Sequence, residues 1–235
     1  RSSKDASTTG TMNFGTQPFY MSNIVMLGNW GQQIWSAPTS DATQRTIHNC
    51  VFGVSFQDDC VSLDGRGLIV VSDTVFYAAG DSDGANYHSS TVGTGETIEI
   101  NVVAYANGVA AAASADISAN GSTIHDGRKI IRINCVAEGN GNRNFHDVGI
   151  GTRVWMLGCR AANPTSGVAD DFGKGNFAFS RDDSATDTVK AWLDSCTTGG
   201  GGAYDLWSGG ASEVYTRNMD MSAWRVRGTG TVTAY

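Results

Sequence analysis

Proline and leucine are scarce in this 235-residue chain, and long helical periodicities are hard to find. Only 3 residues are proline, so the chain is not of the Pro/Gly-rich disordered class. The lack of a helical period favours an all-β fold. No apolar run reaches the roughly 18 residues that a membrane-spanning helix needs, so we expect no membrane span.

The motifs of common chemistries are also absent. The sequence has no Cys-x-x-Cys, no Gly-x-Ser-x-Gly and no His-Glu-x-x-His, which are patterns of zinc sites, hydrolases and metalloproteases. It has no basic cluster, and the net charge is -7, so we expect no direct binding of nucleic acid. We therefore predict no enzyme activity, no catalytic residue, no metal and no cofactor.

Five cysteines are spread widely along the chain, at positions 50, 60, 135, 159 and 196. Several lie in or beside apolar runs, where a small buried thiol fits well. We predict a reduced chain assembled in a cytosol, and one or two disulfides in a secreted protein are the alternative. The chain starts at Arg1 without an initiator methionine, so we expect a cleaved or partial chain.

Glycine, in contrast, is abundant, with 30 residues among many Ser, Thr, Asn and Asp. This composition predicts short strands separated by tight turns. Asp64-Gly65 is a hairpin signal, and the apolar run 22–30 predicts a strand buried on both faces. We predict strands over 22–30, 49–57, 67–76, 97–105, 129–136, 152–159 and 187–196.

The run Asn23-Ile24-Val25-Met26-Leu27-Gly28 has an echo in Arg153-Val154-Trp155-Met156-Leu157-Gly158. Repetition of a short apolar run predicts a unit used twice. We therefore predict a jelly-roll-like β-sandwich built from two related halves. The expected parts are an N-terminal arm (1–15), a first unit (16–145) and a shorter second unit with a C-terminal docking strand (146–235).

The order of these signals resembles a β-sandwich module of tailed-bacteriophage tail, fibre or capsid-associated proteins. The resemblance is carried by residues 9–11, 24–30, 52–56, 60–63, 113–117, 129–135 and 154–158. It implies a structural virion protein, oligomeric and without chemistry of its own.

Acidic residues and histidines give few specific candidates for a metal-binding or catalytic site. Asp81-x-Asp83-Gly84 starts like a calcium loop, but the twelfth position is Val92, so a solvated turn is the expectation. Asp58-Asp59, Asp170-Asp171 and Asp182-Asp183 are possible carboxylate pairs for glycoside hydrolysis. Adjacent strand residues point to opposite faces, so we expect turns there. We expect turn and strand-end roles for the four histidines, which are His48, His88, His125 and His146. Separately, Asn120-Gly121-Ser122 matches the acceptor sequence for N-glycosylation.

Aromatic residues in or beside Gly-rich loops are the candidates for surface recognition, because such rings stack on sugars or anchor interfaces. They are Trp30, Trp35, Tyr87, Trp207 and Tyr215.

We therefore expect a structural protein of a virus particle, assembled in the host cytoplasm from copies of itself and other virion proteins. A host surface glycan is a possible further partner. The alternative is a carbohydrate- or receptor-binding module, on a fibre or secreted as an extracellular lectin-like protein. A polysaccharide-degrading enzyme is the least favoured hypothesis.

Overall fold

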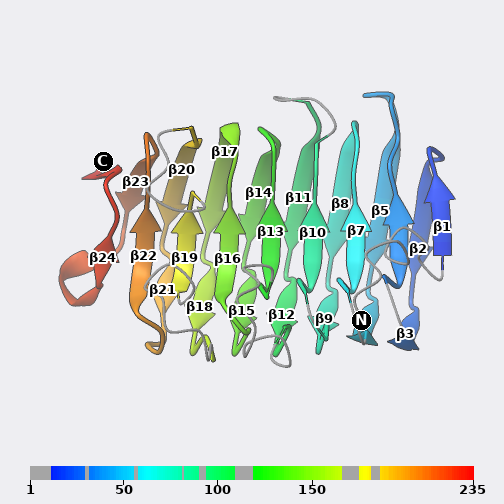
Figure 1. Cartoon of the computed structure of the whole chain (residues 1–235), viewed down its shortest axis with the longest axis horizontal. Helices are drawn as coiled ribbons and strands as arrows, with labels where there is room; N and C mark the ends of the chain where they lie inside the picture. The colour runs from blue at the N-terminus through cyan, green and yellow to red at the C-terminus, as the bar shows by residue number, and fades with distance from the viewer. Residues whose placement is uncertain are drawn as a thin grey trace.

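The structure is a computed structural model that describes residues 12–29, 32–55, 58–80, 82–89, 94–108, 119–165, 175–180 and 186–235. The chain advances along one long axis, from β1 and β2 at one end to β23 and β24 at the other (Figure 1). The described residues also include a short 3-10 helix, η3 (Met221–Ala223). The expectation of an all-β fold is therefore confirmed.

The strands form three parallel sheets, which we call A, B and C. Sheet A has nine strands: β1 (Met12–Gly15), β4 (Ile34–Ser36), β7 (Val61–Leu63), β10 (Ala85–Tyr87), β13 (Ser122–Ile124), β16 (Arg143–Asp147), β19 (Gly175–Phe179), β22 (Tyr204–Ser208) and β24 (Val226–Arg227).

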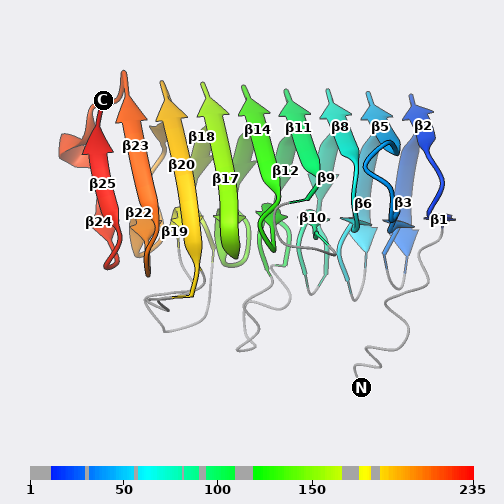
Figure 2. The same ribbon diagram turned by 90° about the horizontal axis from the view of Figure 1, so that it is seen from above.

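Sheet B also has nine strands, which point the same way in Figure 2: β2 (Phe19–Ser22), β5 (Gln44–His48), β8 (Leu68–Ser72), β11 (Glu96–Ile100), β14 (Lys129–Ile133), β17 (Ile150–Leu157), β20 (Thr188–Asp194), β23 (Glu213–Arg217) and β25 (Thr231–Ala234). Sheet C has seven: β3 (Val25–Asn29), β6 (Val51–Ser55), β9 (Val75–Tyr77), β12 (Val103–Tyr105), β15 (Val136–Glu138), β18 (Arg160–Ala162) and β21 (Thr197–Thr198).

The chain passes from sheet A to B to C and back to A, so most strands pair with the strand three elements further on. Each circuit is one coil, and stacked coils make a parallel β-solenoid. The predicted jelly-roll-like sandwich of two related halves is therefore wrong. Sheets A and B both continue across residues 145–146, where the sequence suggested a boundary between units.

The corner between sheets B and C is the regular feature of the coil. One residue there adopts a left-handed backbone conformation, and its N–H donates to a carbonyl of the next coil. Asn, Asp and Gly adopt this conformation at the least cost, and they occupy most of these positions. The corner residues are Asn23, Asn49, Asp73, Asn101, Asn134, Gly158 and Ser195.

These corners explain why several predicted strands have the wrong bounds. The predicted strand 97–105 divides at Asn101 into β11 and β12, and 129–136 divides at Asn134 into β14 and β15. A single left-handed residue turns the chain into another sheet without a two-residue turn motif. The strand expected over 187–196 is confirmed as β20. Asp64-Gly65 connects β7 in sheet A to β8 in sheet B, so it is not a hairpin turn.

The echo between residues 23–28 and 153–158 is also not the true repeat. Met26 lies in β3 of sheet C, whereas Met156 lies in β17 of sheet B. The two runs therefore occupy different places in their coils. Burial of the first run on both faces is wrong as well, because Val25 is 67% and Leu27 is 52% exposed.

The interior of the solenoid combines apolar columns with buried charges, among them a cluster around Arg132. Arg132 donates from Nε to Glu99 Oε2 (2.8 Å) and from Nη1 to Asp147 Oδ2 (2.7 Å). The hydroxyls of Tyr87 and Ser122 both donate to Glu99 Oε1, at 2.8 and 3.1 Å. Burial alone would lower the pKa of Arg132, but the charges of Asp147 and Glu99 outweigh it and hold that pKa above its ordinary value.

All five cysteines are free and buried, as the prediction of a reduced chain requires. Four of them immediately follow a corner residue, and each thiol lies within hydrogen-bonding distance of the carbonyl two residues earlier. They are Cys50 (3.2 Å), Cys135 (3.5 Å), Cys159 (3.8 Å) and Cys196 (3.6 Å). A small side chain with a weak donor therefore suits this inward position after the corner.

Both described ends of the chain pair within the same chain. Strands β1 and β2 pair with β4 and β5, and β24 and β25 pair with β22 and β23. Within the described residues, no helix is long and apolar enough to cross a membrane.

Candidate functional site

The outward side of sheet B carries a column of large apolar side chains, which we call the aromatic column. Strand register places one member on each of five neighbouring strands, from β11 to β23. Successive side chains of a strand alternate between the two faces, so these residues point away from the interior. The members are Ile98, Ile131, Trp155, Trp192 and Tyr215.

The three rings of the column stack on one another. The ring centroids of Trp155 and Trp192 are 5.1 Å apart with 8° between their planes, and those of Trp192 and Tyr215 are 5.6 Å apart with 13°. Parallel rings in van der Waals contact are separated by only about 3.5–4 Å, so these rings must be offset sideways. Offset stacking leaves part of each ring face uncovered.

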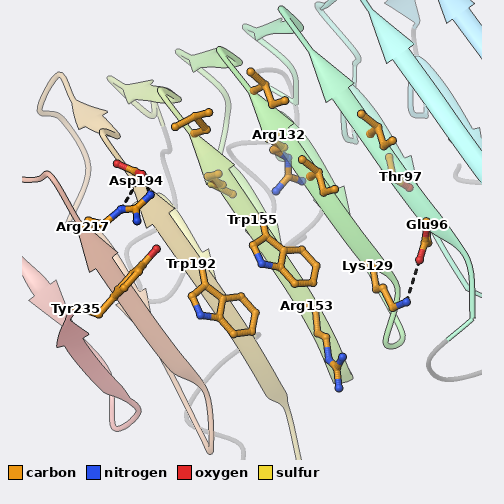
Figure 3. Close-up of a pocket in the computed structure, with 15 residues that line it drawn as sticks. Glu96, Thr97, Lys129, Arg132, Arg153, Trp155, Trp192, Asp194, Arg217 and Tyr235 are labelled. Atoms are coloured by element: carbon orange, nitrogen blue, oxygen red, sulfur yellow. Dashed lines mark hydrogen bonds and ion pairs between the residues drawn. The ribbon is translucent and has the colours of Figure 1, made fainter.

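Charged residues flank the aromatic column on both sides (Figure 3). On one side, Lys129 pairs with Glu96 (2.9 Å), and Arg153 lies on the next strand. On the other side, Arg217 pairs with Asp194. Hydrogen bonds from Arg217 hold the pKa of Asp194 below its ordinary value, and Asp194 raises the pKa of Arg217 in return. Both ionic groups therefore stay charged near neutral pH.

A shallow groove of about 590 Å³ runs over this face. Its lining includes Lys129, Ile131, Arg153, Trp155, Trp192 and Tyr235. Chemically, it offers partly uncovered indole faces, aliphatic side chains and cations, but no nucleophile with an activating base. These groups can stack on a ring and pair with an anion.

Of the five recognition residues predicted from sequence, Tyr215 alone is a member of this column. Tyr87 is fully buried, and Trp207 is 5% exposed on sheet A. The Trp35 indole, also on sheet A, donates to Asp64 Oδ2 (3.3 Å). Trp30 lies outside the described residues.

Sequence reasoning missed Trp155 and Trp192, although a signal for them exists. Trp155, Trp192 and Tyr215 each lie three positions before a left-handed residue. These residues are the corners Gly158 and Ser195, and Asn218, which directly follows β23. An alignment of the chain on its left-handed corners would have placed the three rings in one column. The apparent repeat of residues 23–28 at 153–158 instead matched a strand of sheet C with a strand of sheet B.

Sheet A has a second groove, of about 560 Å³, with a different chemistry. Its lining includes Asp59, whose two carboxylate oxygens accept from the Asp83 backbone N–H (2.9 Å) and from Asn86 (3.0 Å). Burial raises the pKa of Asp83 to about 7, and burial together with the charge of Asp83 raises that of Asp59. Asp83 accepts hydrogen bonds from Asn120, so these carboxylates are engaged by the protein itself.

The remaining sequence candidates fall into three groups. His88 stacks on His125 (4.2 Å), whose ring meets His146 edge-on (6.4 Å), whereas His48 lies near Asp73 (3.4 Å) on another part of the surface. Asn120 of the glycosylation sequon is 1% exposed. Asp81 and the pairs at 170–171 and 182–183 lie outside the described residues. In the part of the chain that the structure describes, no three His, Cys, Asp or Glu residues form a metal-binding group.

No protein-family model matches this chain, and no curated protein matches its sequence.

Proposed function

We propose that this protein is a rod-like attachment protein that binds a glycan on the outer face of sheet B. The observation that carries this proposal is the offset-stacked aromatic column on an open sheet face. Partly uncovered indoles are well suited to stack on the apolar faces of sugar rings.

Folding does not account for the aromatic column. The described apolar core includes Trp224 among its packed neighbours, but Trp155, Trp192 and Tyr215 do not belong to it. An apolar strip that extends across five strands, rimmed by charges, is typical of an interaction surface.

The spacing of the column also favours a glycan. Neighbouring strands lie about 4.8 Å apart, so the solenoid repeats its surface at that interval. A pyranose residue in an extended polysaccharide has nearly the same length. A glycan lying along the solenoid axis would therefore place successive sugars over successive strands.

Binding of the full-length protein to immobilised and soluble glycans tests this proposal. We expect Trp155→Ala and Trp192→Ala each to weaken binding about tenfold or more, because each removes a stacking face. Tyr105→Ala is the matched control, because Tyr105 is an exposed stacked aromatic on sheet C. The proposal is wrong if no glycan binds, or if the tryptophan variants bind as well as Tyr105→Ala.

Assembly into a virus particle is the second function that we propose, with an extracellular fibre as the alternative setting. The first coil supports it: its strands β1, β2 and β3 have a described neighbour on one side only. Tyr20 (70% exposed), Val25 (67%) and Leu27 (52%) lie on this coil. Apolar side chains beside open strand edges favour pairing with another chain.

Light scattering of the native protein tests assembly directly. We expect an oligomer that dissociates in the Tyr20→Lys, Leu27→Lys double variant, because both charges would lie in the contact. A monomer unchanged by these substitutions would overturn the assembly proposal and leave the glycan proposal to its own test.

A further inference from the structure

We propose that the glycan is acidic and that its carboxylate or sulfate group binds Arg153. This inference rests on the proposed glycan-binding function and adds the chemical class of the ligand. It comes from a column of charged residues beside the aromatic column.

Three cations follow one another on neighbouring strands of sheet B. Lys129 of β14 is in register with Arg153 of β17, which is in register with Lys190 of β20. Glu96 precedes and Glu213 follows these cations in the same column. The order is therefore one carboxylate, three cations and one carboxylate.

The two outer cations have partners in the protein, whereas the central one has none among the described residues. Lys129 pairs with Glu96 (2.9 Å), and Lys190 pairs with Glu213 (3.2 Å). Among the described residues, Arg153 forms no ion pair and is exposed between the two lysines. Like charges directly opposite on neighbouring strands destabilise a sheet, so an external anion at Arg153 would relieve this repulsion.

Arg153 and Trp155 can act on the same ligand. They lie two residues apart on β17, so their side chains point to the same face, and both line the groove of about 590 Å³. Figure 3 shows them on the same side of the strand. A guanidinium binds a carboxylate or sulfate through two parallel hydrogen bonds, while the neighbouring indole contacts the sugar ring.

The charge balance distinguishes an acidic glycan from a nucleic acid. A nucleic acid carries a phosphate at every residue and needs many unpaired cations, whereas this column offers Arg153 alone among its described members. A polysaccharide with widely spaced acidic groups fits both the cation and the aromatic rings.

Calorimetric titration with matched oligosaccharides tests the inference. The probes are alginate, polygalacturonate, polysialic acid and heparan sulfate oligosaccharides, each beside its carboxyl-reduced or desulfated counterpart. We expect at least one acidic probe to bind about tenfold or more tightly than its neutral counterpart, and less tightly as salt rises.

Variants separate the role of charge from that of stacking. We expect Arg153→Gln to remove the preference for the acidic probe and most of the salt dependence, while binding of the neutral counterpart changes less than about twofold. Trp155→Ala should weaken both probes. Arg160→Gln is the matched control, because it removes an exposed arginine from sheet C. Unchanged circular dichroism would confirm that each variant is folded.

The outcomes distinguish this inference from the function on which it rests. If acidic and neutral probes bind equally, or if Arg153→Gln keeps the preference, the acidic-glycan inference is wrong and the glycan-binding function stands. If none of the probes binds, or if Trp155→Ala binds them normally, the glycan-binding function is wrong as well.

Discussion

The interior and the outer face of sheet B differ, and on β14 they reverse the usual pattern. On β14, Arg132 is fully buried while its neighbour Ile131 is 40% exposed. On β17, Met156 faces the interior while Trp155 lies on the open face. The buried Arg132 is paired with both Glu99 and Asp147, so its charge serves the fold. The exposed rings and Arg153 have fewer partners among the described residues, as the proposed ligand binding requires.

The largest effect expected from this comparison is the loss of the buried cation. Arg132→Met leaves Glu99 and Asp147 in the interior without their counterion, so we expect the free energy of unfolding to fall by about 3–5 kcal/mol. Denaturant unfolding measures the change. Arg153→Met on the outer face is the matched control, with an expected change within about 0.5 kcal/mol. Equal changes in the two variants would contradict the distinction between the interior and the face.

The next effect concerns the buried carboxylates of sheet A. Burial raises the pKa of Asp83 from 3.8 to about 7 in the folded protein. Between these pH values the folded protein binds more protons than the unfolded chain, so the free energy of unfolding falls as the pH rises. We expect a total loss on the order of 4 kcal/mol from Asp83.

Unfolding measured from pH 4 to pH 8 checks this dependence. Asp83→Asn keeps an oxygen that accepts from Asn120 but does not titrate, so its stability should decline less across the window. Identical pH profiles for the two proteins would show that Asp83 does not titrate there.

A smaller effect is expected at the corner between sheets B and C. Asn134 has a φ of 53°, and a left-handed conformation costs an ordinary L-residue about 1–2 kcal/mol. We therefore expect Asn134→Ala to lower the free energy of unfolding by that amount and Asn134→Gly to change it little. Thermal or denaturant unfolding of both variants measures these changes in the free energy of unfolding. A loss in the glycine variant as large as in the alanine variant would instead assign the effect to the asparagine side chain.

The smallest expected effect lies in the aromatic column itself. A double-mutant cycle of Trp155→Ala and Trp192→Ala should give a coupling energy of about 0.5–1.5 kcal/mol, the usual range for a stacked aromatic pair. Unfolding of the two single variants and the double variant measures it. A larger coupling would mean that the column stabilises the fold, which would weaken the argument that it serves a ligand.

Sequence reasoning located short strands and buried thiols correctly, but it failed on how the strands associate. The alternation around residues 97–105 and 129–136 was visible, yet the left-handed residues Asn101 and Asn134 inside these runs were not recognised as corners. A corner of one residue leaves no conventional turn motif. The hairpin interpretation of Asp64-Gly65 then favoured antiparallel pairing and a sandwich.

The candidate site was less accessible from the sequence than the strands. Trp155, Trp192 and Tyr215 are far apart along the chain and become neighbours only through the register of β17, β20 and β23. The prediction that aromatics in loops mark the surface selected Tyr87 and Trp207, which the structure buries. Loop position alone does not tell on which side of a coil a ring lies.

The sequence by itself determined the local structure: abundant glycine and asparagine permit frequent corners, and alternating side chains give each short strand an inner and an outer face. Tertiary structure decided the rest, because parallel pairing joins residues that are a full coil apart. Stacking of coils brought Arg132 to Glu99 and Asp147 and aligned the indoles beside Arg153. The coils differ in length, so no fixed spacing in the sequence records that register, and only the hydrogen bonds between strands set it.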